Sequence, residues 1–475
     1  MKYSMKLSLA LVLGISSSVG LCSNDKAKPN VVLFLFDDMG WKDLGVYGAE
    51  IYETPNIDQL AEDGCRFTQA YTSALICSPA RASIMTGKHP LKLEMWNHLQ
   101  TIKKKDATDL LPQLLSDAGY STWHVGKWHM GNPKDQTMPT DLGFQKNIGG
   151  WISWGPGSYF WPYNWKEEGG SMGHPNDCIP LREGGQEGEQ ITDRLTREAI
   201  SLIKNRAKDK PFFLNFWYYS VHNRKEAKSE LIRKYENKIK DAGLKPTYRK
   251  HQYTGDSIVT SETNAVYAAM LETVDNSVGE VVKLLKAIGE YENTLFIFYS
   301  DNGPTTNDVP CTPLMGGKNT TYEAGVRMPA FFTWKTEIES GTVSNDRIII
   351  MDIYNTVLEA SNIDIPEGYH GDGVSLISHF HGKSVPDRDF YWYFPWNRPM
   401  YAGRSSAALL DKNGMKYIHF FEGDHPELYN LNVDMAEEND LIRNHSKKGE
   451  HMAQKLAHYL DEVGISRMKK QLAKE

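Results

Sequence analysis

The sequence predicts an α/β protein with a mostly parallel central sheet flanked by helices, and a small C-terminal subdomain with an antiparallel sheet and a terminal helix. Residues 31–36, 211–217 and 294–299 are nearly continuous apolar runs, as expected of parallel strands that are covered on both faces. Amphipathic helical segments lie between these runs. After about residue 380, short segments alternate apolar and polar residues, which is typical of antiparallel strands.

The remaining elements follow from the same patterns. Helices are expected where apolar residues recur at helical spacing, over residues 106–118, 192–205, 263–288 and 352–360. In the C-terminal part, strands are expected over residues 390–394, 405–410 and 416–421, and the terminal helix over residues 448–463. We therefore expect a signal peptide over residues 1–25, a large domain over residues 26–380 and an α+β subdomain over residues 381–475.

The overall charge excludes one class of partner. The chain has 475 residues, of which 53 are Lys or Arg and 60 are Asp or Glu, giving a net charge of −7. A nucleic-acid-binding protein of this size would usually be basic, so no nucleic-acid partner is expected.

The N-terminus has the layout of a bacterial secretory signal. An apolar run over residues 7–21 follows two lysines and is too short to span a bilayer. Cleavage is expected before Lys26, which would leave a periplasmic or secreted protein without a membrane span. Cys22 offers an alternative as a lipoprotein site, although Leu21 is a poor residue before a lipidated cysteine.

Polar side chains follow two of the three apolar runs. Asp37 and Asp38 end the first run, and Asp301 and Asn302 come one residue after the last. Ligands in α/β sheets bind at the carboxyl ends of parallel strands. These side chains offer only oxygen atoms, which favour a hard divalent cation such as Ca²⁺. The alternative is that an aspartate merely caps the turn after its strand.

A second candidate site begins at Cys77. Ser78 is a good N-cap, Pro79 is a good first helical residue and Gly87 is a natural stop, so a short helix is expected directly after Cys77. The helix start favours an anion, and Arg81 on the first turn can fold back toward Cys77. This combination suggests a site for an oxyanion. The alternative is a buried cysteine ahead of an ordinary helix.

Two further stretches are candidates for contacts with a ligand. Lys127 and His129 flank an aromatic residue, so in an extended chain both would face one anion, although such a pair can also be solvated surface. Residues 149–170 are rich in aromatic residues and have neither helical nor strand periodicity. That loop is either a patch of core or a surface on which sugar rings stack; it contains Trp151, Trp154 and Trp161.

The eleven residues 77–87 resemble the signature of the type I sulfatases, Cys-x-Pro-x-Arg with Thr-Gly five and six residues after the arginine. Residues 119–129 resemble the second signature of that family. The resemblance continues in ordered blocks over nearly the whole mature chain, at residues 39–41, 54–58, 316–318, 322–329 and 427–431. It implies an alkaline-phosphatase-like fold, with residues 427–431 as the last strand.

The resemblance also implies a modified nucleophile and a metal. Cys77 would be oxidised by a formylglycine-generating maturation enzyme to Cα-formylglycine, or 3-oxoalanine, whose hydrated aldehyde attacks sulfur. One Ca²⁺ would be held by Asp37, Asp38, the modified Cys77, Asp301 and Asn302. Arg81 and Lys127 would stabilise the hydrated aldehyde, and His129 would take the proton from its second hydroxyl group.

The family pattern places Lys318 and His222 at the sulfate and the leaving oxygen, with His222 as the better general acid. The residues after His222 depart from the family pattern. Arg224 among them, together with Trp151, Trp154 and Trp161, is a candidate for contacts with the substrate.

The implied activity is hydrolysis of a sulfuric ester in a sulfated polysaccharide or oligosaccharide. One alternative is a phosphodiesterase or phosphonate hydrolase of the same superfamily. Another is a catalytically inactive glycan-binding relative, and a third is a metal that serves only structure. The intact set of catalytic candidates argues against the last two, because a purely structural metal site does not need Cys77.

Overall fold

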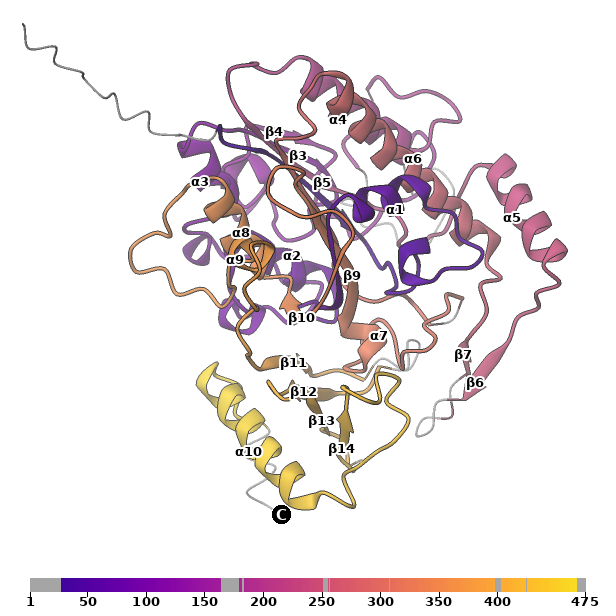
Figure 1. Ribbon diagram of the computed structural model, residues 1–475, viewed down its shortest axis with the longest axis vertical. Helices are drawn as coiled ribbons and strands as arrows, with labels where there is room; N and C mark the ends of the chain where they lie inside the picture. The colour runs from indigo at the N-terminus through magenta and orange to yellow at the C-terminus, as the bar shows by residue number, and fades with distance from the viewer. Residues whose placement is uncertain are drawn as a thin grey trace, which may run out of the picture.

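The computed structural model describes residues 27–163, 179–181, 183–250, 255, 257–306, 308–397, 403–423 and 425–467. The expected signal peptide, Cys22 and residues 164–170 of the aromatic loop lie outside these ranges. Figure 1 shows a large sheet with helices on both faces, and a smaller sheet with the C-terminal helix at one end of it.

The large sheet has eight strands in the order β10-β2-β9-β8-β1-β5-β3-β4. β9 is antiparallel to both its neighbours, and every other pair is parallel, which confirms the mostly parallel sheet. The three predicted runs form the adjacent central strands β8, β1 and β5. The strand bounds are β1 Asn30–Phe36, β2 Cys65–Tyr71, β3 Ser121–Gly126, β4 Lys146–Ile148, β5 Phe212–Trp217, β8 Thr294–Ser300, β9 Arg327–Thr333 and β10 Thr342–Ile349.

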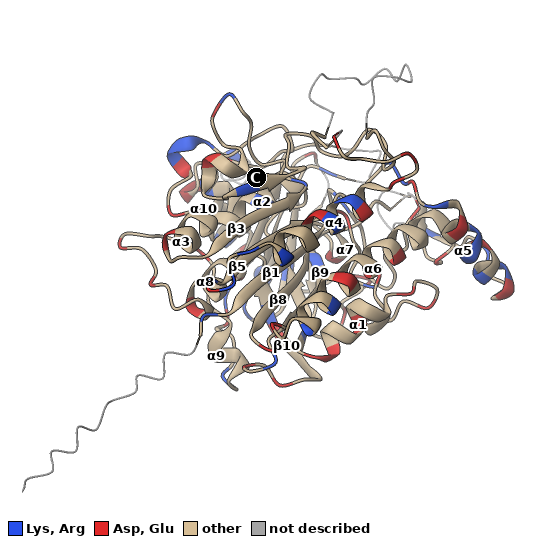
Figure 2. Ribbon diagram, turned by 90° about the horizontal axis from the view of Figure 1, so that it is seen from above, with Lys and Arg blue, Asp and Glu red and all other residues tan. Residues whose placement is uncertain are grey.

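Helices cover both faces of this sheet (Figures 1 and 2). Alternate residues of β1 pack into two different core clusters, because successive side chains of a strand point to opposite faces. On one face lie α1 Pro55–Glu62, α4 Ile191–Lys204 and α6 Ala265–Ala287, and on the other α2 Cys77–Thr86, α3 Leu111–Asp117 and α8 Asp352–Ala360. α5 Ser229–Asp241 packs outside α6, followed by a hairpin of β6 Tyr248–Lys250 and β7 Ser257–Val259.

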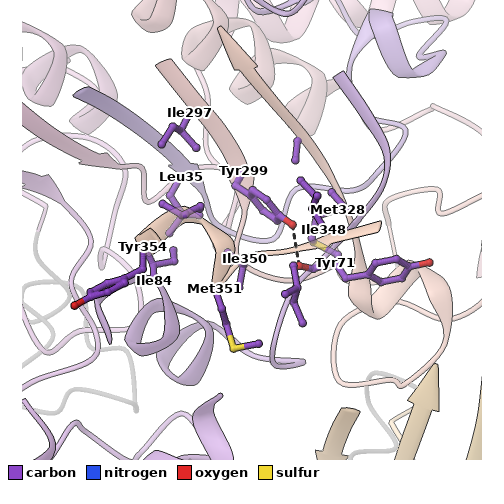
Figure 3. Packing of buried hydrophobic residues seen from close by; sticks show 14 of the residues in the cluster. Leu35, Tyr71, Ile84, Ile297, Tyr299, Met328, Ile348, Ile350, Met351 and Tyr354 are labelled. Carbon is purple, nitrogen blue, oxygen red and sulfur yellow. Dashed lines mark hydrogen bonds between the residues drawn. The ribbon is translucent and has the colours of Figure 1, made fainter. Parts of the chain in front are cut away.

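The core beneath α2 and α8 is drawn in Figure 3. Leu35 and Tyr299 from neighbouring strands meet Ile84 of α2 and Tyr354 of α8, all fully buried. The Tyr299 hydroxyl donates to the carbonyl of Tyr71 at 2.8 Å, so its polar atom is satisfied inside the core. Burial of each such side chain contributes about 1.5–3 kcal/mol, and this packing fixes α2 against the sheet.

One predicted helix is shorter than expected. The helix predicted over residues 106–118 begins only at Leu111, because Asp109 adopts a left-handed conformation with φ 55° that a helix does not continue through. Pro112 then lies in the first turn, where its missing N–H costs no hydrogen bond. Ahead of this turn the chain forms only a short 3₁₀ turn, Lys104–Asp106.

The C-terminal part is an antiparallel sheet, as predicted, and its four strands follow one another in sequential order. α10 packs across it through an apolar cluster that includes Leu409, Leu428 and Leu456. The Trp392 indole donates to the carbonyl of Thr72 at 2.8 Å and so joins this sheet to the large one. The predicted boundary at residue 380 stays a prediction. The bounds are β11 Phe390–Phe394, β12 Ser406–Leu410, β13 Met415–Phe420, β14 Glu427–Asn430 and α10 Ser446–Glu462.

None of the helices in the described ranges is both long enough and apolar enough to cross a membrane.

Candidate active site

The carboxyl ends of β1 and β8 bring the predicted oxygen ligands together. The two strands are neighbours, with Phe36 opposite Ser300, and the Asp301 N–H donates to the Phe36 carbonyl at 3.0 Å. Asp37 and Asp301 therefore leave the sheet side by side. Asp38 has φ 64°, a left-handed turn that reverses the chain directly after Asp37. Both strand ends are buried, so the acidic groups lie close to one another and away from bulk solvent.

The acidic groups have the donor set of a cation site. One ligand atom each from Asp37, Cys77 and Asp301 lies within 4.8 Å of the others. The Asn302 amide donates to Asp38 Oδ1 at 2.6 Å. Asp37 Oδ1 and Asn302 Oδ1 are buried and have no hydrogen-bond partner among the described residues. Such acceptors require compensation, and an oxygen-binding cation such as Ca²⁺ fits them.

Arg81 ties α2, which begins at Cys77, to this cluster. Its guanidinium donates to Asp301 Oδ2 from Nε at 2.9 Å, and its Nη2 lies 2.7 Å from the same oxygen. Its Nη1 donates to the Lys127 carbonyl at 3.1 Å, and its Cζ lies 5.1 Å from the centroid of the Trp217 ring. The side chain is fully buried. Arg81 was expected to fold back toward Cys77, and its main partner in the structure is Asp301.

Two lysines complete the positive side of the cluster. Lys127 forms a short ion pair with Asp37, and Lys318 Nζ lies 2.6 and 2.7 Å from the two oxygens of Asp38. Burial opposes the charge of Asp37, but Lys127, His222 and Arg81 hold its pKa below the usual range. Burial and the neighbouring Asp37 raise the pKa of Asp301 to about 7. A further cation next to Asp301 would lower this pKa and stabilise the charged carboxylate.

His129 lies directly against Cys77, with 3.2 Å between Nδ1 and Sγ. Burial, Lys127 and Arg81 lower the pKa of His129 well below its ordinary value, so the ring is neutral and can accept a proton. Burial raises the pKa of Cys77, so the residue is a protonated thiol. A protonated, buried thiol is a poor nucleophile, which fits a precursor residue better than a thiol catalyst.

The expectation of an extended chain around His129 is wrong. β3 ends at Gly126, and His129 has φ 58°. Trp128 between the two candidates stacks on Trp217 with ring centroids 5.6 Å apart. The chain therefore reverses locally at this point. Lys127 and His129 reach the same site through this reversal, and not through the alternation of side chains along a strand.

His222 lies beside Asp38, whereas His129 lies beside Cys77. Its Nε2 is 3.7 Å from Asp38 Oδ2, and its Nδ1 is 2.6 Å from the Asn223 carbonyl. The short contact makes Nδ1 the protonated atom, because a carbonyl only accepts, and so Nε2 faces the site. Burial and Lys318 lower the pKa of His222 to about 4.

The four residues that were expected to contact the substrate lie in different surroundings. Trp154 lies beside His222, with ring centroids 5.4 Å apart. Trp151 packs against the core under α2, and its carbonyl accepts from the His129 N–H at 3.0 Å. Trp161 packs against the other core cluster. Arg224 is exposed, two residues after His222.

Sequence reasoning did not single out Trp217, on which Arg81 and Trp128 pack. The sequence feature that could have indicated Trp217 is its place at the end of an apolar run, which puts it at the same edge of the sheet as Asp37.

Comparison with known proteins identifies the family. The sequence profile of the sulfatase family matches residues 29–363, which include every candidate catalytic and metal-binding residue, and the profile of the N-sulphoglucosamine sulphohydrolase C-terminal region matches residues 316–465. The chain belongs to the sulfatase family. The enzyme is therefore a sulfuric ester hydrolase with an alkaline-phosphatase-like fold.

Relatives of this sulfatase cover most of its length. N-acetylgalactosamine-6-sulfatase of Rattus norvegicus is 31% identical over 409 residues, which are 81% of this chain and 72% of the relative. A sulfatase of Formosa agariphila is 28% identical and covers 92% of this chain and 89% of its own. The crystal structure of Ps i-CgsB in complex with k-i-k-neocarrahexaose matches with a TM-score of 0.76 and 28% identity, over 91% of this chain and 93% of that one.

Proposed function

We propose that this sulfatase removes sulfate from a sulfated oligosaccharide or polysaccharide, using formylglycine formed from Cys77 and one bound Ca²⁺. The observation that carries the proposal is the buried contact between Cys77 and His129 beside acidic groups with two unpartnered oxygens. The carbohydrate substrate is supported by relatives, which include an N-acetylgalactosamine-6-sulfatase and a structure that contains a neocarrahexaose.

The proposed metal ligands are Asp37, Asp38, the modified Cys77, Asp301 and Asn302. All five residues are buried, and those other than Cys77 offer oxygens, which suits Ca²⁺. A bound Ca²⁺ would supply positive charge and orientation to the sulfate group.

The protein's own cations prepare the site for an anion. Lys127 and Lys318 are both within contact of a carboxylate and have three donors each, so part of their donor capacity remains for sulfate oxygens. Burial opposes the charge of Lys318, but Asp38 raises its pKa, so this lysine remains protonated at the leaving side. A sulfate ester would repel a nucleophile unless such groups neutralise it first.

His129 and His222 would move protons at opposite sides of the reacting group. In the structure Cys77 Sγ stands where an oxygen of the hydrated aldehyde would be, and the neutral His129 Nδ1 next to it would accept that oxygen's proton. His222 directs Nε2 into the site. An approaching sulfate raises the proton affinity of this nitrogen, so His222 would deliver a proton to the leaving oxygen, with Lys318 beside it.

We further propose that residues 1–25 direct export and that the mature enzyme is periplasmic or secreted. Within it, residues 26–380 would form the catalytic domain and residues 381–475 the C-terminal subdomain. Cys77 would be modified by a formylglycine-generating enzyme of the host. The signal-like pattern of the N-terminus and the sulfatase signature at residues 77–87 support these assignments.

The first test is mass spectrometry of the peptide that contains Cys77, after expression with a formylglycine-generating enzyme. Conversion of CH₂SH to CHO should lower its mass by about 18 Da, and aryl sulfatase activity should rise in proportion to the converted fraction. Cys65→Ala is the matched control, because Cys65 is a buried cysteine far from the site in β2 and should leave the mass shift and the rate intact. Full activity from the unmodified thiol would contradict the proposal.

The second test compares substrates. We expect hydrolysis of 4-methylumbelliferyl sulfate to exceed that of an aryl phosphodiester and an aryl phosphonate monoester, and to be lost after chelation and restored by Ca²⁺. N-acetylgalactosamine 6-sulfate and a neocarrageenan hexasaccharide would serve as saccharide probes. Faster turnover of the phosphorus esters would identify a phosphodiesterase or phosphonate hydrolase instead.

A further inference from the structure

A tight turn at residues 97–100 lies beside the catalytic residues and was not singled out by sequence motifs. The Asn97 side-chain oxygen accepts from the N–H groups of Leu99 and Gln100 at 2.7 and 3.2 Å. The Gln100 side-chain oxygen accepts in return from the N–H groups of Trp96 and Asn97 at 2.7 and 2.9 Å. These four bonds fix the turn with its own side chains and leave His98 and Leu99 at its tip.

The turn is attached to both segments that carry the nucleophile and its base. The Ser78 hydroxyl, next to Cys77, donates to the Gln100 carbonyl at 2.8 Å. The Ile102 N–H donates to the carbonyl of Met130, next to His129, at 2.8 Å. The tip therefore has a fixed position relative to the reacting group.

The exposure of these residues places the turn at the rim of the site. Cys77 and His129 are 3% and 5% exposed, whereas His98 is half-buried and Leu99 is 80% exposed. His98 is also near enough to His129 for a positive charge on its ring to contribute to the lowered pKa of His129. His98 and Leu99 are therefore the residues of this turn that a group extending from Cys77 toward solvent can contact.

We propose that His98 is a specificity-determining residue that hydrogen-bonds a hydroxyl group of the sugar ring that carries the sulfate, while Leu99 contacts the apolar face of that ring. The inference rests on the proposed function. An imidazole ring has at least one N–H donor in either protonation state, and the oxygen of a hydroxyl group can accept from it. A sugar ring has hydroxyl groups next to its sulfated carbon, whereas a simple aryl sulfate has none, so the turn would distinguish the two substrate classes.

The test is the ratio of kcat/KM on the saccharide probe to kcat/KM on 4-methylumbelliferyl sulfate. The saccharide probe is whichever of N-acetylgalactosamine 6-sulfate and the neocarrageenan hexasaccharide the wild-type enzyme cleaves faster. His98→Ala should lower this ratio by about tenfold, as expected for one lost hydrogen bond. His98→Gln keeps a donor and an acceptor and should recover part of the ratio. His451→Ala removes an exposed histidine of α10 and should change neither rate.

The outcomes separate this inference from the proposed function. An equal loss on both substrates in His98→Ala, or an unchanged ratio, would overturn the role of His98 while leaving the saccharide sulfatase intact. A wild-type enzyme that cleaves the aryl sulfate but neither saccharide would overturn both. Melting temperatures within about 2 °C of the wild type would show that His98→Ala and His98→Gln fold normally.

Discussion

Residues 316–326 contribute to two clusters of buried charge, Lys318 to one and Glu323 to the other. The two clusters differ in the contacts that their side-chain oxygens make. The first is the active site described above, which Lys318 enters from this segment. The second begins at α7, Glu323–Val326, and joins the large domain to the C-terminal sheet. Its members are Glu323, Lys416, Glu427 and Glu437.

Every carboxylate oxygen of the second cluster lies within 3.0 Å of a nitrogen or hydroxyl group of the protein, although the contact of Lys416 with Glu437 Oε1 is an ion pair and not a hydrogen bond. Lys416 Nζ lies 2.9 Å from Glu323 and 2.8 Å from Glu437, and Glu437 also accepts from the Glu323 N–H at 2.6 Å. The remaining oxygen of Glu323 accepts from the Tyr71 hydroxyl at 3.0 Å. Glu427 accepts from two tyrosine hydroxyls, those of Tyr322 and Tyr429. This cluster is complete without any ligand.

The candidate active site, by contrast, leaves Asp37 Oδ1 and Asn302 Oδ1 without a hydrogen-bond partner among the described residues, and Arg81 Nη2 lies 3.8 Å from Asp37 Oδ1. Burial of charge alone therefore does not distinguish a functional site from a structural one in this protein. The difference is whether a group of the protein lies close to each buried oxygen. Mutations in the two clusters should therefore separate loss of activity from loss of stability.

The largest effect is expected from Asp301→Asn. The change removes the ionic partner of Arg81 and one proposed metal ligand, so kcat/KM on an aryl sulfate should fall by about a thousandfold or more. Addition of Ca²⁺ to chelated protein should raise the melting temperature of the wild type and not of the variant. Asp275→Asn, which alters a buried acid bonded to α1, is the control and should keep the rate. A variant Asp301→Asn with more than a tenth of the wild-type rate would exclude this carboxylate from the site.

Lys416→Met should have the largest effect on stability. It leaves Glu323 and Glu437 buried without their shared cation, and the removal of one partner from such a group costs about 3–5 kcal/mol. Urea denaturation should show the loss, while folded protein should keep a rate far closer to wild type than Asp301→Asn does. Lys412→Met, at an exposed position in the turn between β12 and β13, should be neutral. A stable Lys416→Met variant would show that this cluster does not hold the two sheets together.

Glu427→Gln tests the second cluster through pH. Burial raises the pKa of Glu427 from 4.5 to about 7, so the folded state binds this proton more tightly than the unfolded chain. Its contribution to stability is fully present below pH 4.5 and is lost as pH rises through about 7. Between about pH 5 and pH 8, the free energy of unfolding of the wild type should therefore decrease by up to about 3 kcal/mol more than that of Glu427→Gln. Parallel pH profiles for the two proteins would place the titration elsewhere.

The smallest effect concerns the aromatic loop. Trp154 lies beside His222, so Trp154→Ala should lower kcat/KM on a sulfated oligosaccharide by about tenfold more than on an aryl sulfate. Trp161 packs against the core, so Trp161→Ala should lower the melting temperature and affect both substrates equally. The reverse pattern would make Trp161 the subsite and Trp154 a core residue.

The fold was predictable where burial leaves a simple pattern. The runs at β1, β5 and β8 are covered on both faces and read as continuous apolar segments. β10 was missed because it is an edge strand whose first residues are partly exposed and polar. β9 was missed because Pro329 interrupts it, and proline is rare inside sheets.

The sequence allowed the residues of the candidate site to be predicted, but not the contacts between them. The end of the first apolar run indicated Asp38 and the family block at residues 316–318 indicated Lys318, but their contact spans 280 residues and depends on the sheet order. The division of the aromatic loop could not be predicted, because aromatic side chains suit a core and a sugar surface equally well. The turn at His98 escaped notice because its order comes from side-chain hydrogen bonds of Asn97 and Gln100, which have no sequence periodicity.

The sheet order has a consequence for biosynthesis. β1 is completed only when β8 pairs with it, and Asp38 meets Asp301 across 263 residues of chain. In the finished fold Cys77 is only 3% exposed, so the proposed maturation enzyme would reach it more easily before β8 pairs with β1. Pairing between segments so distant in the sequence is a slow step of folding, and a variant that folds faster would then leave less time for the proposed oxidation of Cys77.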